Sequence, residues 1–398
     1  MIKLAGRAVN ISPSPTLSID AKAKKMAAEG LDVVNFGVGE PDFDTPDHIK
    51  QAAVEALQKG MTKYTPAAGT DSLRAAIVKK FKEDNGLSYQ PSQIVVSAGA
   101  KHSLYNAFQV LCQEGDEVVL PAPYWVSHLE QIKLAGAVPV IVQTRASNGY
   151  KITPEELESV LTRRTRVILL NSPSNPTGAV YTRGELEELG GILVRQGVTI
   201  ISDEIYEKLI YDGAEHVSIA SLSPELKELT VVINGVSKSY AMTGWRIGYA
   251  AAPQAVAKAM ADLQSHSTSN PTSIAQAASV AALEGTQEPL REMVGEFNKR
   301  RDYMLERVNA IPGLSCGRPE GAFYLFPDLS HYLGRSYGSR KIEGSGDLAG
   351  ILLEDARVAL VPGVAFGDDH CFRLSYATSM ERIKEGLDRI EKIVAQIK

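Results

Sequence analysis

Lys238 is the residue whose type and surroundings most clearly indicate chemistry. It lies in the segment VSKSYAMTGWRIGY, residues 236–249, directly after an apolar run that is expected to be a strand. A lone loop lysine is usually a solvated charge, but here Arg246 follows in a glycine-containing turn, and a nearby cation lowers the pKa of an amine. Such an amine can form a Schiff base with a carbonyl compound. Ser237 and Arg246 could also hold a phosphate group, so the segment predicts a Schiff-base site beside an anion site.

Asp203 and Tyr206 lie where another strand is expected to end. The run TIISD, residues 199–203, is almost continuously apolar, as buried parallel strands are, and ligands bind beyond the carboxyl ends of such strands. An acid at this point can also be a plain helix N-cap, and that interpretation stays open for Asp203. The functional alternative is that Asp203 pairs with a protonated ring nitrogen, so that the ring can accept electrons. Tyr206 could then hydrogen-bond a hydroxyl group on the same ring.

Three further segments place one polar or aromatic residue in a stiff or apolar setting. Asn175, in LLNSPSNPTG, is either part of a structural turn or an amide held in place by a proline-rich loop. Trp125, in PAPYWVS, is either a core residue or a flat surface that stacks on a ring. Arg373, in FRLSYAT, lies within an apolar strand. Because a buried arginine needs a partner and its planar guanidinium suits a carboxylate, Arg373 is a candidate for binding a carboxylate substrate.

The segment IVVSAGAK, residues 94–101, runs from an expected strand through a small-residue turn into an expected helix. Backbone N–H groups at the start of a helix bind phosphate well. Lys101 in the first helical turn opposes the helix dipole, at a typical cost of ~0.3–1 kcal/mol. Bound anions would offset that cost, so the segment predicts a second part of the anion site.

Strands and helices alternate through the middle of the chain, which predicts an α/β domain with a mostly parallel, seven-stranded sheet. The expected strands are 93–97, 117–120, 138–142, 167–171, 199–203, 231–234 and 247–251, and helices are expected at 101–112, 127–134 and 183–195. The last third differs, with a long amphipathic helix at 288–309, short strands at 322–326, 358–361 and 371–375, and a closing helix at 380–397. We therefore expect a large domain over residues 46–287. A smaller α+β domain would combine residues 288–398 with residues 1–45, which include a helix at 18–29.

Composition excludes several classes of protein. The chain has 398 residues and a net charge of −5, which argues against a nucleic-acid partner. Its three cysteines, Cys112, Cys316 and Cys371, form no CxxC pair, and with no HExxH motif no metal site or disulfide framework is expected. No secretory signal or long apolar run is visible, so we expect no membrane span and a cytoplasmic protein.

Taken together, the segments GEPDFDTP, KYTPAAG, SAGAK, PAPYWVS, NSPSNPTGAVY, SDEIYE, SKSYAMTGWRIGY, GAFY and RLSYAT resemble the class I and II aminotransferases, which are pyridoxal-phosphate enzymes of fold type I. They are most similar to the Iβ aspartate aminotransferase subgroup, and the resemblance covers essentially the whole chain. It implies that Lys238 carries pyridoxal 5'-phosphate. It also implies the following roles: Asp203 pairs with the ring nitrogen; Tyr206 and Asn175 contact the ring hydroxyl; Trp125 stacks on the ring; Gly99, Ala100, Ser237 and Arg246 hold the phosphate; Tyr64 reaches the phosphate of a neighbouring subunit in a homodimer; and Arg373, Asn175, Trp125 and the backbone at Gly39 fix the substrate α-carboxylate.

The segment SHSTSNPTS departs from the animal-type aspartate enzymes, because it has no arginine to read the distal carboxylate of the substrate. In the Iβ subgroup the residue similar in position to Lys101 takes that role, and in its prephenate-using members an N-terminal arginine contributes, for which Arg7 is the candidate. The resemblance thus implies transfer of the amino group of L-aspartate to 2-oxoglutarate, giving oxaloacetate and L-glutamate by a ping-pong mechanism. Two alternatives stay open: a glutamate/aspartate-prephenate aminotransferase that makes arogenate, and a pyridoxal-phosphate β-lyase. A regulator that only binds the cofactor is disfavoured, because the N-terminal region is too short and insufficiently basic for a DNA-binding helix pair.

Overall fold

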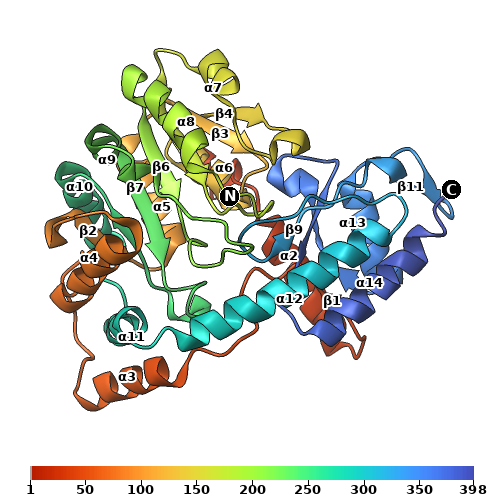
Figure 1. Ribbon diagram of the computed structural model, residues 1–398, viewed down its shortest axis with the longest axis horizontal. Coiled ribbons are helices and arrows are strands. Elements are labelled where there is room, and N and C mark those ends of the chain that lie inside the picture. The colour runs from red at the N-terminus through yellow and green to blue at the C-terminus, as the bar shows by residue number, and fades with distance from the viewer. Residues whose placement is uncertain (1) are drawn as a thin grey trace.

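A mixed seven-stranded sheet forms the centre of the large part of the molecule, as a computed structural model that describes residues 2–398 shows (Figure 1). Its strand order is β2-β8-β7-β6-β5-β3-β4, and only β8 runs antiparallel to its neighbours. The strands are β2 (Ile94–Ser97), β3 (Glu117–Ala122), β4 (Val138–Gln143), β5 (Thr165–Asn171), β6 (Thr199–Asp203), β7 (Thr230–Gly235) and β8 (Gly248–Ala251). The predicted α/β fold with a mostly parallel seven-stranded sheet is therefore confirmed.

Helices cover both faces of this sheet, which explains why its strands are apolar on both sides. Successive residues of a strand point to opposite faces. In β3, Val118 and Leu120 pack on one face and Val119 on the other. The first face is covered by α5 (Ala100–Leu111), α6 (Val126–Leu134) and α10 (Gln254–Ser265). The second face is covered by α7 (Pro154–Val160), α8 (Arg183–Gln196) and α9 (Pro224–Leu229). Towards β2, the second face is covered by α3 (Asp47–Gln58), α4 (Asp71–Asn85) and α11 (Ser273–Glu284).

The long helix α12 (Glu288–Ala310) leads from the sheet to a smaller C-terminal unit (Figure 1). At 1.5 Å per residue it spans about 35 Å. Phe297, Met304 and Val308 on its buried face contribute to the core of that unit. The unit contains the sheet β13-β14-β9 and two helices, and the N-terminal strand β1 (Val34–Asn35) pairs with β12 (Val358–Ala359). The bounds of these and the remaining elements of the unit are β9 (Tyr324–Leu325), β10 (Ser336–Tyr337), β11 (Arg340–Lys341), α13 (Ser345–Asp355), β13 (Val361–Pro362), β14 (Phe372–Ser375) and α14 (Met380–Val394).

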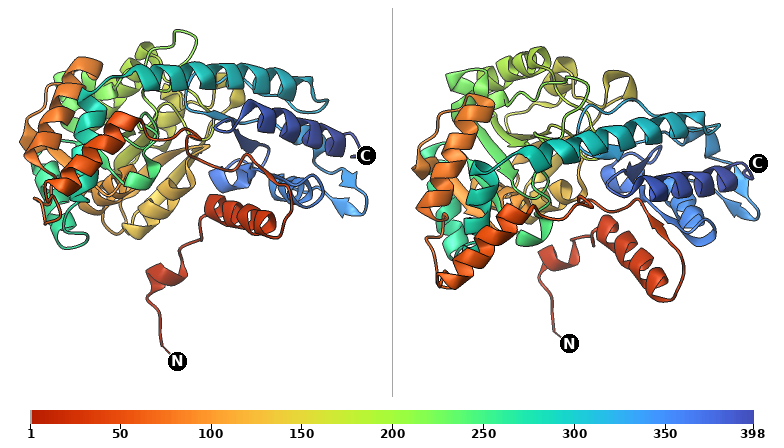
Figure 2. Two further views of the ribbon diagram at one scale, coloured as in Figure 1. Left: turned by 90° about the horizontal axis from the view of Figure 1, so that it is seen from below. Right: turned by 60° about the horizontal axis from the view of Figure 1, so that its bottom comes forward.

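Part of the N-terminal segment packs against this C-terminal unit, and the residues that precede it in the chain extend away from the body (Figure 2). Helix α2 (Pro15–Ala28) contacts β12 and β13, whereas the short helix α1 (Gly6–Val9) has no buried residue. Helix α2 begins earlier than the expected residue 18 because Pro15 occupies its first turn, where the missing N–H is not needed. The division into domains at residues 46 and 287 remains a proposal.

The strands of the C-terminal unit are shorter than the sequence predicts. The expected strand 358–361 is divided into β12 and β13, which pair with different partners, and the closing helix ends at Val394.

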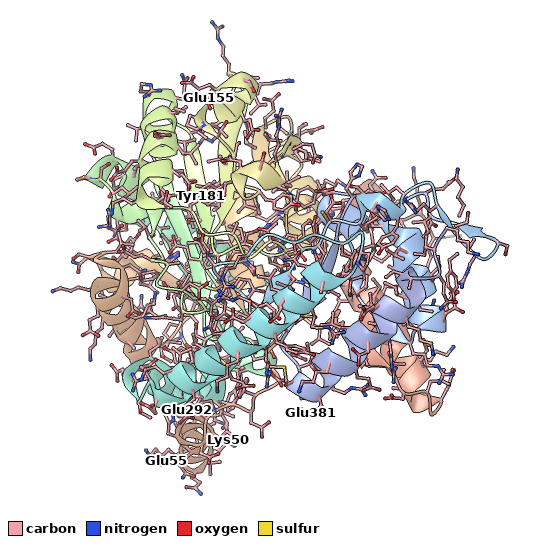
Figure 3. All side chains as sticks on the ribbon, turned by 45° about the vertical axis from the view of Figure 1, so that its right-hand side comes forward. Lys50, Glu55, Glu155, Tyr181, Glu292 and Glu381 are labelled. Atoms are coloured by element: carbon pink, nitrogen blue, oxygen red, sulfur yellow. The ribbon has the colours of Figure 1, made fainter. Side chains whose placement is uncertain are left out.

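Charged side chains such as Lys50, Glu55 and Glu155 project outward, while Tyr181 is buried beneath α8 (Figure 3). Within residues 2–398 no helix combines the length and the apolar character needed to cross a membrane.

Candidate active site

A cavity of about 450 Å³ lies at the carboxyl ends of the strands of the large sheet. Loops that follow β2, β3, β5, β6 and β7 line it from the sheet side, and residues of the N-terminal segment and of the C-terminal unit close the other side. Of the sequence-predicted residues, it brings together Gly39, Ala100, Lys101, Trp125, Asn175, Asp203, Tyr206, Ser237, Lys238, Arg246 and Arg373. The motifs that carry these residues, although distant in the sequence, therefore lie around one cavity.

Lys238 lies in the loop between β7 and β8, and its amine points into the cavity. Nζ donates a hydrogen bond to the Gly39 carbonyl at 2.5 Å and lies 5.8 Å from the centre of the Tyr206 ring. Burial lowers the pKa of the Lys238 amine to about 8; the Glu40 carboxylate opposes this shift, and the cations Arg373 and Arg246 add to it. The amine is therefore available as a nucleophile and a base near neutral pH.

Asp203 ends β6, and its carboxylate is held from two directions. Oδ1 accepts a hydrogen bond from the Ile205 N–H at 3.3 Å, and Oδ2 lies 3.1 Å from Nε2 of His128. His128 is buried on α6 and packs edge-on against Trp125. Asp203 itself is only 3% exposed, so its orientation is fixed by these contacts. A buried, oriented carboxylate can stabilise a protonated ring nitrogen.

The residues predicted to hold a phosphate lie where the start of α5 meets the loop before β8. Arg246 has a left-handed backbone with φ 57°, and its guanidinium donates to the Thr243 and Ala98 carbonyls at 3.0 and 3.3 Å. Gly99 is required because its φ is 88° and a Cβ there would lie 2.3 Å from the Arg246 guanidinium. These groups, with Ser237 and the Ala100 N–H at the positive end of the helix, make a cradle suited to a phosphate.

Arg373 reaches the cavity from β14 of the C-terminal unit. Nη1 donates to Oδ1 of Asn175 at 2.9 Å and Nη2 to the Gly37 carbonyl at 2.8 Å, and the guanidinium carbon lies 4.3 Å from the centre of the Tyr324 ring. The side chain is only 2% exposed, and burial lowers its pKa. No acidic side chain is among these contacts. A carboxylate is therefore the missing partner that this fork-shaped cation would bind.

Lys101 contributes a second cation at the mouth of the cavity. Its Nζ lies 4.9 Å from the centre of the Trp125 ring. Displacement of water around the ammonium group and repulsion by Arg246 lower its pKa. A second carboxylate bound here would stabilise the charged form of Lys101, so the cavity is equipped for a substrate with two acid groups.

Three predicted residues are not among those that line this cavity. Gly99 lies against the Arg246 guanidinium instead. Tyr64 is 91% exposed. Arg7 lines a separate cavity of about 380 Å³ together with Asn10, Glu130 and Lys133. Further lining residues were not predicted, among them Thr16, Lys24, Glu40 and Tyr324, although the last two lie within the segments GEPDFDTP and GAFY. His128, behind Asp203, was not predicted either. The hydroxyl of Tyr324 hydrogen-bonds that of Tyr206 at 2.9 Å, a contact between distant segments that no local pattern signals.

The chain belongs to the family of class I and II aminotransferases, because the model of that family matches residues 31–390. It is 53% identical to the aspartate aminotransferase of Geobacillus stearothermophilus over 99% of both chains. It is 49% identical to the probable aspartate/prephenate aminotransferase of Aquifex aeolicus, again over 99% of both. The crystal structure of the aspartate aminotransferase from Rhizobium meliloti matches with a TM-score of 0.96 and 47% identity, covering 100% of each chain.

Aminotransferases of this family use pyridoxal 5'-phosphate, and the residues of the cavity fit that group. The cofactor needs an amine of lowered pKa, a phosphate cradle and an acid that faces its ring nitrogen. Lys238, the turn around Gly99 and the buried Asp203 meet these three needs within one cavity.

Proposed function

We propose that this chain is an aspartate aminotransferase that moves the amino group of L-aspartate to 2-oxoglutarate and releases oxaloacetate and L-glutamate. The observation that carries the proposal is the combination in one cavity of the Lys238 amine with two cations, Arg373 and Lys101, that have no acidic partner there. Both substrates are amino or oxo acids with two carboxylates, one for each cation. The family and the names of the relatives support the same activity.

Within one chain, the cofactor would be held by residues around the large sheet. Ser237, Arg246, Gly99 and Ala100 would bind its phosphate, and Asp203 would face its ring nitrogen. In further proposed contacts, Trp125 would stack on the ring, and Tyr206 and Asn175 would reach its hydroxyl group. When bound, pyridoxal phosphate supplies a carbonyl carbon that takes up the amino group and a ring that accepts electrons from the substrate α-carbon.

Lys238 would hold and move the proton of the substrate α-carbon. With a pKa of about 8, roughly one tenth of the amine is unprotonated at pH 7 and about half at pH 8. An ordinary lysine would be almost fully protonated at both pH values. General-base catalysis is most efficient when the pKa lies near the working pH, so the buried position of Lys238 prepares it for this role.

Arg373 and Lys101 would orient the substrate. Arg373 would bind the α-carboxylate, assisted by Asn175, by Trp125 and by the backbone at Gly39. Lys101 would bind the distal carboxylate from the opposite side of the substrate. With both carboxylates bound, the α-carbon would keep a constant position relative to Lys238, which favours proton transfer through proximity.

The absorbance spectrum of the purified holoprotein tests the proposal. Addition of L-aspartate, without any 2-oxo acid, should convert the band of the Lys238-bound cofactor to that of its amine form, and 2-oxoglutarate should reverse the change. L-Alanine at the same concentration is the control and should act far more slowly. A holoprotein whose spectrum does not respond to aspartate or glutamate would refute the assignment of these substrates.

Prephenate is the second candidate acceptor, because several relatives of 45–49% identity are named aspartate/prephenate aminotransferases. The two acceptors can be compared directly by adding each to the amine form of the protein. Faster recovery of the original band with prephenate than with 2-oxoglutarate would favour arogenate formation as the main activity. A role for Arg7 in that reaction stays a prediction.

A homodimer with shared active sites is part of the proposal. Tyr64 has 91% of its surface exposed and lies outside the cavity of its own chain, as a residue that serves a neighbouring subunit would. Mixing the inactive variants Lys238→Ala and Tyr64→Ala tests this. Hybrid dimers would contain one intact site, so activity should reappear on mixing, whereas independent sites would give no recovery.

A further inference from the structure

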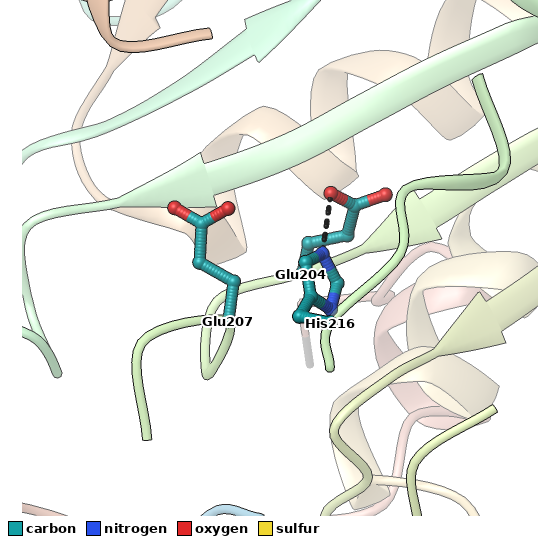
Figure 4. A group of neighbouring side chains, drawn as sticks. All are labelled: Glu204, Glu207 and His216. Atoms are coloured by element: carbon teal, nitrogen blue, oxygen red, sulfur yellow. Dashed lines mark hydrogen bonds and ion pairs between the residues drawn. The ribbon is translucent and has the colours of Figure 1, made fainter. Parts of the chain in front are cut away.

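The turn that follows β6 has two faces. Asp203 and Tyr206 line the cavity, whereas Glu204 and Glu207 belong to a buried cluster with His216 (Figure 4). The turn is closed by a hydrogen bond from the Glu207 N–H to the Glu204 carbonyl at 3.0 Å. The residues that face the cavity and those of the buried cluster therefore alternate within one short turn.

Glu204 is fixed by three side chains although it is only 1% exposed. Oε1 accepts hydrogen bonds from the hydroxyl groups of Ser202 at 2.8 Å and Ser218 at 2.7 Å, and Oε2 lies 3.1 Å from Nε2 of His216. These partners come from β6 and from the loop between Asp212 and Ser218. A buried carboxylate with this many donors has one strongly preferred position.

Glu207 is fixed from a different direction, by helix α4. Lys80 forms a buried ion pair with Oε1, and the amide of Asn85 donates to Oε2 at 3.0 Å. Although burial opposes ionisation, Lys80 and His216 lower the pKa of Glu207 to about 2. The glutamate is thus charged at all physiological pH values.

His216 and Lys80 lie beside the two carboxylates of the cluster. Burial opposes the charged form of His216, but the hydrogen bond and charge of Glu204, together with Glu207, raise its pKa. The protonated form of His216 is thus favoured beside Glu204, and Lys80 is paired with Glu207. Although atoms of Glu204, Glu207 and His216 lie within 4.8 Å of one another, as metal ligands would, the Lys80 ammonium already supplies the positive charge that a metal ion would bring.

The cluster also adjoins the loop that carries Lys238. Burial raises the pKa of Tyr240 and Tyr249, and the charge of Glu207 adds to the rise in both. Tyr240 belongs to the Lys238 loop and Tyr249 to β8. Further charged neighbours are Asp84, 3.8 Å from the Lys80 ammonium, and Lys208, paired with Asp84 at 2.6 Å.

We propose that Glu204 is a positioning residue for the reaction: its buried pair with His216 fixes the turn that presents Asp203 to the cofactor ring. The inference rests on the proposed use of pyridoxal phosphate, because only a ring-nitrogen partner gives the orientation of Asp203 a chemical meaning. Glu204 itself touches neither cofactor nor substrate.

The substitution Glu204→Gln tests the inference, with Glu117→Gln as the matched control. Glu117 is also a buried glutamate, 5% exposed, with an arginine and a threonine hydroxyl as partners, but it lies at the opposite end of the sheet at the start of β3. Apo-protein of each variant is titrated with pyridoxal phosphate to obtain the Kd. The bound protein is then titrated with base to find the pH midpoint of its absorbance change, and thermal unfolding reports on the fold.

Both substitutions should lower the unfolding temperature, but only Glu204→Gln should weaken cofactor binding, by about tenfold, and shift the pH midpoint. Supporting contacts behind metal ligands give losses of this size when removed. Ser218→Ala, which removes a single donor to Glu204, should give a smaller change in the same direction and decides the question if Glu204→Gln does not fold. Equal Kd values and midpoints in wild type, Glu204→Gln and Ser218→Ala would overturn the inference. Failure of the wild-type apo-protein to bind the cofactor would instead refute the proposed function.

Discussion

Replacement of Lys101 by glutamine should change substrate preference without damaging the cofactor site. The Lys101 ammonium lies above the Trp125 ring at the cavity and forms no ion pair with an acidic residue that lines it. Glutamine retains a similar length and a hydrogen-bond donor but removes the charge. The variant therefore isolates the proposed charge-assisted contact with the distal carboxylate.

The size of the effect follows from the contact that is lost. A hydrogen bond to a charged group contributes about 1.5–3 kcal/mol, which corresponds to a loss of roughly 10- to 150-fold in kcat/KM. The loss should apply to L-aspartate and L-glutamate, whereas L-alanine, which has no distal carboxylate, should keep its low rate. Half-reactions followed by absorbance, with each donor alone, measure these ratios without interference from the acceptor.

Lys133→Gln provides the matched control. Lys133 lies on α6, pairs with Glu130 at 3.0 Å and lines the separate cavity near Arg7. The control should leave the aspartate-to-alanine ratio unchanged. If Lys101→Gln lowered the rates with aspartate and alanine equally, or with neither, the assignment of Lys101 to the distal carboxylate would be wrong.

Three further predictions concern stability and the cofactor site. Lys238→Met should stabilise the apo-protein most below pH 8 and progressively less as the pH rises towards 10.5, because burial lowers the folded-state pKa of Lys238 to about 8 and penalises its charged form; urea unfolding of both proteins across this range checks the sign. Arg301→Met should cost about 1–3 kcal/mol in urea unfolding, because the Pro319 carbonyl loses its buried donor, while the Asp212 carboxylate, at 39% exposure, stays hydrated and keeps a second arginine. Gly248→Ala should weaken cofactor binding markedly, because the new Cβ would lie 2.0 Å from the Ala100 nitrogen in the phosphate cradle; a Kd equal to that of the wild type would show that the cradle can move at no cost.

The sequence predicts the large sheet well because its strands are continuous apolar runs between turn residues. The antiparallel direction of β8 could not be predicted in this way, because an antiparallel strand that is buried on both faces has the same residue pattern as a parallel one. Short strands such as β1 and β12 depend on each other across more than three hundred residues of chain, and no local pattern records that pairing. The C-terminal unit is for this reason the part whose strands differ most from expectation.

In the candidate active site too, residues with a local sequence signal could be predicted and residues defined by tertiary contacts could not. Residues that end strands, such as Asp203, or stand out among apolar neighbours, such as Arg373, are visible in the sequence. His128 is not, because a histidine within an amphipathic helix gives no sign that it contacts β6. The cluster of Glu204 and His216 is likewise formed by tertiary folding, because its members come from separate segments of the chain.

The antiparallel return of β8 gives the loop of residues 236–247 a special place in the molecule. Lys238 and Arg246, the proposed anchors for the two ends of the cofactor, lie on this single loop, and both of its ends are fixed in the same sheet. Arg373, which would bind the substrate, belongs to the C-terminal unit instead. The spacing between these proposed anchors is consequently set within the large sheet and does not depend on the position of the C-terminal unit. In the proposed reaction, substrates would therefore exchange while the cofactor stays bound.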